Sequence, residues 1–166
     1  MRLEELNHWW TEGRVRPEFV PQTHRDVFRE IKENLGRRQL QVVVGLRRVG
    51  KSTVFFQLIN DLIKAGVDPL HIVYCSFDEP ELQEKRIGDI LEEYSTLTDV
   101  DYKKDKIYLF LDEAQKSPNW VADVKLIYDH LPNIKIFVSG SASLNILAEA
   151  KKSLAGRAIY HELGPL

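Results

Sequence analysis

With 166 residues, 43% of them hydrophobic, the chain is long enough to fold as one compact domain around a sizeable core. Its formal net charge of −2 gives no nucleic-acid signature, and its single cysteine excludes an internal disulfide framework. No apolar run approaches the roughly 20 residues of a membrane-spanning helix, and the N-terminus lacks the apolar segment of a secretory signal. The five histidines are scattered without metal-ligand spacing. We therefore expect a cytoplasmic protein with no membrane partner and no zinc site.

Residues 1–36 are expected to form an arm and a helix that pack on a core of residues 37–166. Residues 3–10 favour a short amphipathic helix or an arm, and Thr23 is suited to cap a helix over about residues 25–35. Positive charge is concentrated at this end, with 11 Lys and Arg against 7 Asp and Glu in the first 53 residues. A solvated basic face is the favoured explanation, and a DNA-binding surface is the alternative.

Residues 45–53 have the spacing G-x-x-x-x-G-K-[ST], which is typical of a phosphate-binding loop. A β-branched run ends at Gly45 and apolar residues at helical spacing follow Lys51, so the required strand–loop–helix context is met. The glycines let backbone N–H groups converge on anionic oxygens at the positive end of a helix dipole. Lys51 is expected to reach the β- and γ-phosphates, and Ser52 to contact Mg²⁺. The predicted nucleotide-binding set is Gly45, Arg47, Arg48, Val49, Gly50, Lys51, Ser52 and Thr53.

The rest of the chain alternates between strand and helix patterns. This alternation predicts an α/β domain with a mostly parallel sheet and helices on both faces. Because the helix over residues 25–35 comes just before the first strand, we expect His24 and Arg25 to border a pocket for the nucleotide base. Strands are predicted over 39–44, 71–77, 107–111, 134–138 and 158–163, and further helices over about 54–65, 87–97 and 118–131, the last with Ser117 as its N-cap.

Two carboxylates, Asp112 and Glu113, follow the apolar strand over residues 107–111. Ligands bind at the carboxyl ends of strands in open α/β sheets. Asp112 is expected to hold Mg²⁺, mainly through water, opposite Ser52, and Glu113 to act as general base on the attacking water. Alone this motif is weak, but together with the phosphate-binding loop it indicates a P-loop nucleoside triphosphatase.

Three polar residues later in the chain are further candidates. Ser139, or as second choice Ser141, can hydrogen-bond the γ-phosphate or the attacking water from the tip of its strand, although a plain Ser/Gly turn explains them equally well. Arg157 can contact phosphate or a neighbouring subunit, and a structural salt bridge is at least as good an explanation. The predicted catalytic set is therefore Lys51, Glu113, Ser139 and Arg157.

Four segments, residues 46–52, 111–115, 138–141 and 154–157, together resemble the AAA-like core of the archaeal-type ATPases, which are related to the signal-transduction ATPases. This resemblance implies a three-layer core with a five-stranded parallel sheet of order 5-1-4-3-2. It also implies ATP with Mg²⁺ rather than GTP, and no guanine-reading Asn/Thr-Lys-x-Asp motif is present. The carried-over roles are Gly45, Gly50, Lys51 and Ser52 for phosphates and metal, Asp112 for metal, Glu113 for water, and Ser139 or Ser141 as sensor.

Members of this family continue past such a core into a helical lid and a winged-helix-like segment. The resemblance therefore leads us to expect a core truncated before that region, with homo-oligomer contacts and a DNA or protein partner depending on the C-terminal segments. The function expected is a Mg²⁺-dependent ATPase that couples ATP binding and hydrolysis to conformational change. A slowly hydrolysing switch that controls a partner and a DNA-associated motor are the alternatives. A small P-loop kinase is the weaker one, because no arginine-rich lid is visible.

Overall fold

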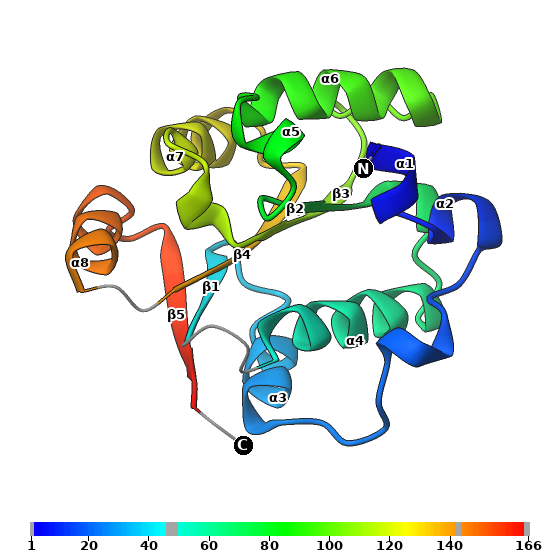
Figure 1. The fold of residues 1–166 in the computed structure, drawn as a ribbon, viewed down its shortest axis with the longest axis horizontal. Coiled ribbons are helices and arrows are strands. Elements are labelled where there is room, and N and C mark those ends of the chain that lie inside the picture. The colour runs from blue at the N-terminus through cyan, green and yellow to red at the C-terminus, as the bar shows by residue number, and fades with distance from the viewer. Residues whose placement is uncertain (1, 46–49, 142–143, 165–166) are drawn as a thin grey trace.

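The computed structural model describes residues 2–45, 50–141 and 144–164, and within them five parallel strands form one sheet in the order β2-β3-β4-β1-β5 (Figure 1). Read from the other edge, this is the predicted order 5-1-4-3-2, which is confirmed. The strands are β1 (Leu40–Gly45), β2 (Ile72–Ser76), β3 (Ile107–Asp112), β4 (Ile134–Ser141) and β5 (Ala158–Leu163). The longer helices are α3 (Asp26–Glu33), α4 (Lys51–Lys64), α6 (Ile87–Thr98), α7 (Trp120–His130) and α8 (Leu144–Ser153). The short ones are α1 (Leu3–Leu6), α2 (Trp9–Glu12), α5 (Pro80–Gln83) and the 3-10 turns η1 (Pro17–Phe19), η2 (Pro69–His71) and η3 (Ala114–Lys116).

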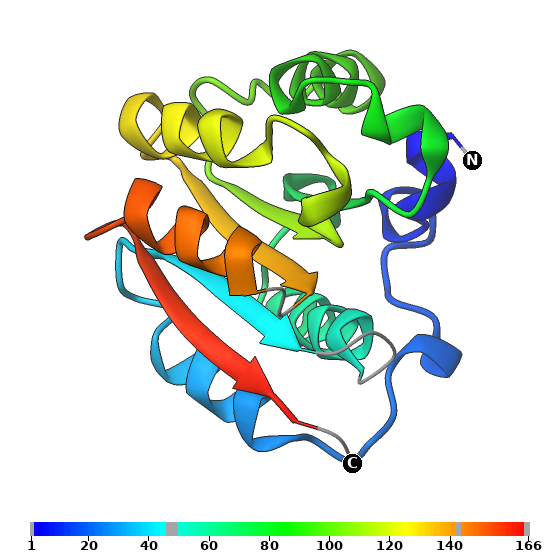
Figure 2. The same ribbon diagram turned by 60° about the vertical axis from the view of Figure 1, so that its left-hand side comes forward.

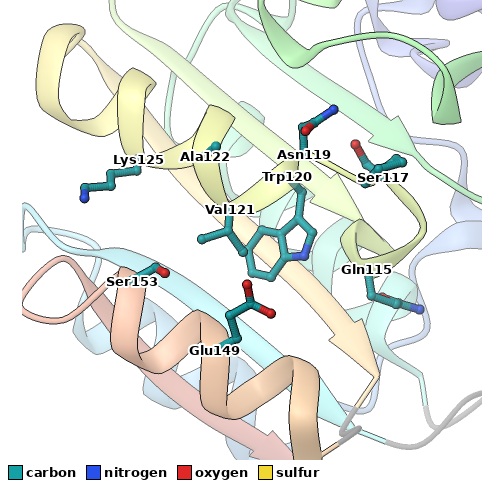
Figure 3. Close-up of a pocket in the computed structure, with 10 residues that line it drawn as sticks. Gln115, Ser117, Asn119, Trp120, Val121, Ala122, Lys125, Glu149 and Ser153 are labelled. Atoms are coloured by element: carbon teal, nitrogen blue, oxygen red, sulfur yellow. The ribbon is translucent and has the colours of Figure 1, made fainter.

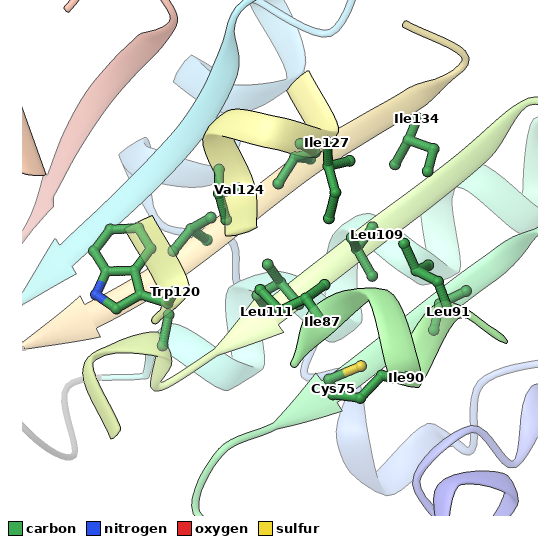
Figure 4. Packing of buried hydrophobic residues seen from close by; sticks show 14 of the residues in the cluster. Cys75, Ile87, Ile90, Leu91, Leu109, Leu111, Trp120, Val124, Ile127 and Ile134 are labelled. Carbon is green, nitrogen blue, oxygen red and sulfur yellow. The ribbon is translucent and has the colours of Figure 1, made fainter. Parts of the chain in front are cut away.

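Helices cover both faces of the sheet, with α6, α7 and α8 on one face and α3 and α4 on the other (Figures 1 and 2). Successive residues of a strand point to opposite faces, so one strand contributes side chains to two separate hydrophobic cores. On β2, Val73 and Cys75 belong to the core under α6 and α7, which Figure 4 shows, whereas Ile72 and Tyr74 belong to the core under α3 and α4. Burial raises the pKa of the Cys75 thiol to about 12, so this buried cysteine stays a protonated, apolar core residue.

The N-terminal arm contains two short helices, α1 and α2, instead of the single helix predicted over residues 3–10. The break falls at Asn7, which leaves the helical conformation (φ −118°, ψ 60°) and turns its side chain onto the edge strand β2. The indole N–H groups of Trp9 and Trp10 both donate to the carbonyl of Ile72, at 3.1 and 2.8 Å. The arm therefore supplies β2 with hydrogen bonds on the side where no strand pairs with it in the sheet.

Two predicted N-caps, Thr23 and Ser117, are wrong, although α3 starts within one residue of its predicted start. Helix α3 begins at Asp26 with Arg25 at the N-cap position, and the Thr23 carbonyl accepts a hydrogen bond from the side chain of Gln57 at 2.9 Å. Helix α7 begins after Asn119, since buried Ser117 closes the η3 turn, with its N–H bonded to the carbonyl of Ala114. No element was predicted where α8 lies, and β4 runs to Ser141 because it stays paired with β1 as far as Gly45.

Among the residues described by the structure, no helix is both long enough and apolar enough to span a membrane.

Candidate functional site

The carboxyl ends of β1, β3 and β4 meet the N-terminus of α4, as the motif spacing predicts. Gly50 caps α4 with φ at +94°, a left-handed conformation that glycine adopts without steric cost. Lys51 is the first residue of α4, and only 3% of it is exposed. The chain between β1 and Gly50 lies outside the described residues, so the expected contacts of Arg47, Arg48 and Val49 stay predictions.

The Lys51 ammonium lies among three oxygen atoms. Its Nζ donates to the carbonyls of Gly45 at 3.1 Å and Gly140 at 3.2 Å, which belong to the ends of β1 and β4. It forms an ion pair with Glu113 Oε1 at 3.1 Å. An ammonium has three N–H donors, so each of these oxygens can take one. The structure thus places the predicted phosphate-binding lysine directly against the predicted general base.

Asp112, at the end of β3, is almost fully buried and accepts hydrogen bonds from hydroxyl groups on three different elements. Ser52 Oγ and Tyr74 OH each lie 2.5 Å from Oδ2, and Ser139 Oγ donates to Oδ1. A buried carboxylate needs such donors, because an unpaired buried charge is strongly unfavourable. The side-by-side carboxylate and Ser52 hydroxyl are hard oxygen ligands of the kind that Mg²⁺ prefers, so these residues fit the predicted metal site.

Tyr74 was not singled out by the sequence, yet its hydroxyl is the third donor to Asp112. Burial first, and then the negative charge of Asp112, raises the pKa of Tyr74 well above its usual value. The phenol therefore stays protonated and keeps a hydrogen to donate. The only sequence signal was a tyrosine within a largely apolar strand, and this pattern is equally typical of a tyrosine that only fills the core.

Glu113 adopts a left-handed backbone conformation, with φ at +54° and ψ at +46°. Such a conformation in a residue other than glycine costs on the order of 1–3 kcal/mol and is often found at functional sites. The turn lets the Glu113 N–H donate to Ser139 Oγ at 3.0 Å, while Oε2 of its carboxylate accepts from Gln115 Nε2 at 2.6 Å. The carboxylate therefore lies between Lys51 and Gln115.

Gln115 is the second residue that the sequence did not single out. Its Oε1 accepts from the N–H of Ser141 at 3.2 Å, which fixes the orientation of the amide so that its NH₂ group faces Glu113. A possible signal was its place two residues after Glu113, in one of the segments that carried the family resemblance.

The two candidate sensors differ in their surroundings. Ser139 is fully buried, donates to Asp112 and accepts from the Glu113 N–H, so its hydroxyl links both carboxylate residues. Ser141 is half-buried and its backbone N–H bonds Gln115. Contact of either hydroxyl with a γ-phosphate stays a prediction.

Comparison with known proteins agrees with this geometry. A model of the AAA domain family matches residues 37–166. The chain belongs to this family. An uncharacterised protein of Methanocaldococcus jannaschii is 31% identical over 130 residues, which are 78% of this chain and 27% of that protein. A second uncharacterised protein of that organism is 32% identical over 139 residues, 83% of this chain and 29% of that protein. The chain thus spans less than a third of the length of these curated relatives.

The structure of AMPPCP-bound DnaA from Aquifex aeolicus has the same fold as this AAA domain. The TM-score is 0.58 at 15% identity, and the match covers 90% of this chain and 51% of that chain. At this identity the likeness supports the fold alone. Together with the family match, it makes this chain an AAA-like P-loop ATPase, a nucleotide-binding domain in general.

Arg157 of this AAA domain lies far from the phosphate-binding lysine. It precedes β5, whose first residue pairs with Leu40 at the start of β1, whereas Lys51 follows the opposite end of β1. Its guanidinium forms an ion pair with Asp129 of α7 at 2.9 Å. The expectation that Arg157 contacts phosphate in its own chain is therefore wrong, and the alternative salt bridge is confirmed. A contact with a neighbouring subunit stays a prediction.

A largely apolar pocket of about 290 Å³ adjoins the start of α4 and is the best candidate for the base. Arg25 lines it, together with Thr53 of the phosphate-binding set, but His24 does not belong to its lining and stacks on Phe28, with ring centroids 4.2 Å apart. Arg25 therefore stays a candidate for contact with the base, whereas His24 lies outside the lining of this pocket. The lining consists of Pro21, Thr23, Arg25, Gly50, Thr53, Val54 and Gln57.

A wider surface pocket of about 460 Å³ lies between α7 and α8 (Figure 3). Trp120 and Glu149 face each other across it, and Gln115 lies at one end. None of the described residues that line it belongs to the predicted phosphate-binding set. This pocket is therefore separate from the predicted nucleotide site around Lys51.

Proposed function

We propose that the chain binds ATP with Mg²⁺ and hydrolyses it, and that binding and hydrolysis change its conformation. One observation carries this proposal: at the carboxyl edge of the sheet Lys51 forms an ion pair with Glu113, and Ser52 is hydrogen-bonded to Asp112, the residue just before Glu113. Each has the chemistry that its step requires. The neighbouring pocket, which Arg25 lines, is largely apolar, as a binding site for the adenine base would be.

The Lys51–Glu113 ion pair suggests how binding prepares hydrolysis. A γ-phosphate is a stronger anionic partner for Lys51 than one carboxylate, so its arrival would draw Nζ away from Glu113 Oε1. Glu113 would then be free to accept a proton from a water molecule as its oxygen attacks the γ-phosphorus and ADP leaves. Ser52 and Asp112 would hold Mg²⁺, which when bound supplies positive charge against the phosphate oxygens. Gln115 would keep the Glu113 carboxylate in place throughout.

A slowly hydrolysing nucleotide switch is the alternative, and the same ion pair favours it. A general base bound to a lysine is not available to water, so a chain that releases Glu113 only rarely would bind ATP tightly and turn it over slowly. Activation would then require another protein or DNA. Since the chain spans less than a third of its curated relatives, such a partner belongs to the whole protein and is proposed only as a class.

Multiple-turnover ATP hydrolysis by the wild-type chain and by Glu113→Gln distinguishes these functions, with Mg²⁺·ATP binding measured calorimetrically on both. Turnover that falls by about 10²- to 10⁴-fold in Glu113→Gln with binding retained supports the ATPase, because general-base catalysis contributes a factor of that size. Tight binding without turnover in either protein supports the switch. If the wild type binds no ATP, or Glu113→Gln hydrolyses it at the wild-type rate, the proposed mechanism is wrong.

A further inference from the structure

The buried hydroxyl of Tyr74 connects the metal-binding carboxylate to a part of the chain outside the matched family region. Tyr74 OH lies 2.5 Å from Asp112 Oδ2, the same oxygen that accepts from Ser52. If Ser52 turns its hydroxyl oxygen toward a metal ion, its hydrogen bond to Asp112 no longer orients the carboxylate. Tyr74 and Ser139 then remain as the donors that hold Asp112, one on each of its oxygens.

On its outward side, the backbone of Tyr74 is hydrogen-bonded by one side chain of the N-terminal arm. Asn7 Nδ2 donates to the Tyr74 carbonyl at 2.9 Å, and the Tyr74 N–H donates to Asn7 Oδ1 at 2.6 Å. The Asn7 amide thereby pairs both outward backbone groups of one edge-strand residue, as a neighbouring strand would. Nδ2 also donates to the carbonyl of Leu3 at 2.9 Å, so a flipped amide would lose all three bonds.

The ring of Tyr74 is packed between the arm and the helix that carries Ser52. Its centroid lies 4.9 Å from that of Phe56 on α4 and 6.5 Å from that of Trp9 on α2. Both Asn7 and Trp9 are fully buried. Backbone and ring are thus fixed by the same contact between arm and sheet, which leaves the hydroxyl little freedom to leave Asp112.

From these contacts we propose that Tyr74 is a positioning residue for the metal site, and that the N-terminal arm, through Asn7, is a working part of that site. Hydrogen-bond partners of metal-binding carboxylates orient them, and their loss typically lowers metal affinity by 10- to 100-fold. The inference rests on the proposed binding of ATP with Mg²⁺. It adds that the arm, residues 2–12, affects how much Mg²⁺ increases the affinity for ATP. These residues lie outside the family match to residues 37–166.

The test compares ATP affinity in Mg²⁺ with ATP affinity in EDTA, measured by calorimetry on the full chain. The ratio of the two affinities gives the contribution of the metal. Tyr74→Phe keeps the ring and removes only the hydroxyl, so it should shrink this ratio by about 10- to 100-fold while leaving the affinity in EDTA unchanged. Tyr94→Phe is the matched control, because Tyr94 is also buried but donates its hydroxyl to the carbonyl of Leu70 at 2.6 Å.

The role of the arm is tested by Asn7→Ala, alone and combined with Tyr74→Phe. If Asn7 acts through Tyr74, Asn7→Ala shrinks the same ratio but causes no further loss in the Tyr74→Phe background. Trp10→Phe is the control for a loosened arm, since it removes the bond to the carbonyl of Ile72 and part of the packing on Tyr94 but leaves the contacts of Asn7 in place.

Each outcome has one meaning. A wild-type ratio in Tyr74→Phe, or equal losses of affinity in Mg²⁺ and in EDTA, overturns the positioning role, because the second result is that of a purely structural residue. A wild-type ratio in Asn7→Ala overturns the part assigned to the arm. If the wild-type chain itself binds ATP equally well with and without Mg²⁺, the proposed metal site fails, and this inference fails with it. The Tyr94→Phe and wild-type measurements keep these cases apart.

Discussion

Two buried lysines at opposite ends of the sheet show what distinguishes the site from the scaffold. Lys51 follows the carboxyl end of β1 and is 3% exposed, and Lys135 lies near the amino end of β4 and is 6% exposed. The Nζ atom of each donates to two backbone carbonyls. For Lys135 these belong to Arg37 and Gln39, at 2.5 and 2.8 Å, just before β1.

The difference lies in the third partner. Lys51 also contacts the carboxylate of Glu113, whereas among the described residues no carboxylate lies within ion-pair distance of Lys135. Burial, and then the charge of Lys106, lowers the pKa of Lys135 to about 8. Lys135 therefore holds the backbone just before β1 in place. Lys51, in contrast, has a carboxylate partner that an incoming anion can replace. Substitutions at the two lysines and at their neighbours test whether they differ in this way.

Lys51→Met should have the largest effect. It removes the ammonium expected to contact the phosphates and leaves Glu113 without its cation. We expect ATP affinity in Mg²⁺ to fall by about 100-fold or more, since losing one partner of a buried charged contact typically costs 2–5 kcal/mol. Lys135→Met is the matched control for removing a buried lysine, and it should leave ATP affinity unchanged. Equal losses in the two variants would contradict the distinction.

Gln115→Ala should give the next largest effect, on turnover and not on binding. Without the amide, the Glu113 carboxylate loses its 2.6 Å hydrogen bond and gains freedom to leave its productive orientation. We expect kcat to fall by about 10-fold, with the affinity for Mg²⁺·ATP within twofold of wild type, because small misplacements of a catalytic group are costly. In the Glu113→Gln background the same substitution should change kcat little. A further full 10-fold loss there would show that Gln115 does not act through Glu113.

The lowered pKa of Lys135 should make the stability of the protein depend on pH. The folded protein releases the Lys135 proton near pH 8 and the unfolded chain near pH 10.5, so the unfolded state binds more protons between these values. The free energy of unfolding contributed by this group therefore rises with pH across that window. Urea unfolding at about pH 7.5 and pH 10 should show a larger gain for wild type than for Lys135→Met. The same gain in both would contradict the assignment.

Arg157→Ala should have the smallest effect. Its ion pair with Asp129 lies on the surface, where such pairs contribute little to stability. The apparent melting temperature should change only slightly, and the affinity for Mg²⁺·ATP not at all. A large loss of turnover that depends on protein concentration would instead support the predicted contact with a neighbouring subunit.

The sequence predicted those parts of the site that depend on local spacing. Lys51 and Ser52 follow from the loop pattern, and Asp112 and Glu113 follow from their place after an apolar strand. The strand order came from the family resemblance, because no local pattern determines which parallel strands are neighbours. The cap at Thr23 was misjudged because a threonine ahead of a helical pattern does not determine which residue takes the N-cap position, and here that residue is Arg25.

The remaining parts depend on contacts between distant segments. The Tyr74 hydroxyl reaches Asp112 only because β2 pairs with β3 in a register that sets Ser76 beside Asp112. Asn7 lies 67 residues before Tyr74, in an arm whose pattern suggested an ordinary amphipathic helix. Neither contact leaves a periodic signal in the sequence, so both required the three-dimensional structure.

A crystal structure of the full chain with Mg²⁺ and a non-hydrolysable ATP analogue such as AMPPCP would test the central claim most directly. That claim is that Lys51 exchanges the Glu113 carboxylate for phosphate. The account predicts Lys51 Nζ at hydrogen-bond distance from a γ-phosphate oxygen, about 2.7–3.2 Å, with Glu113 released from Lys51 but still bonded to Gln115. An analogue bound elsewhere, or bound here with the 3.1 Å contact between Lys51 and Glu113 intact, would contradict it.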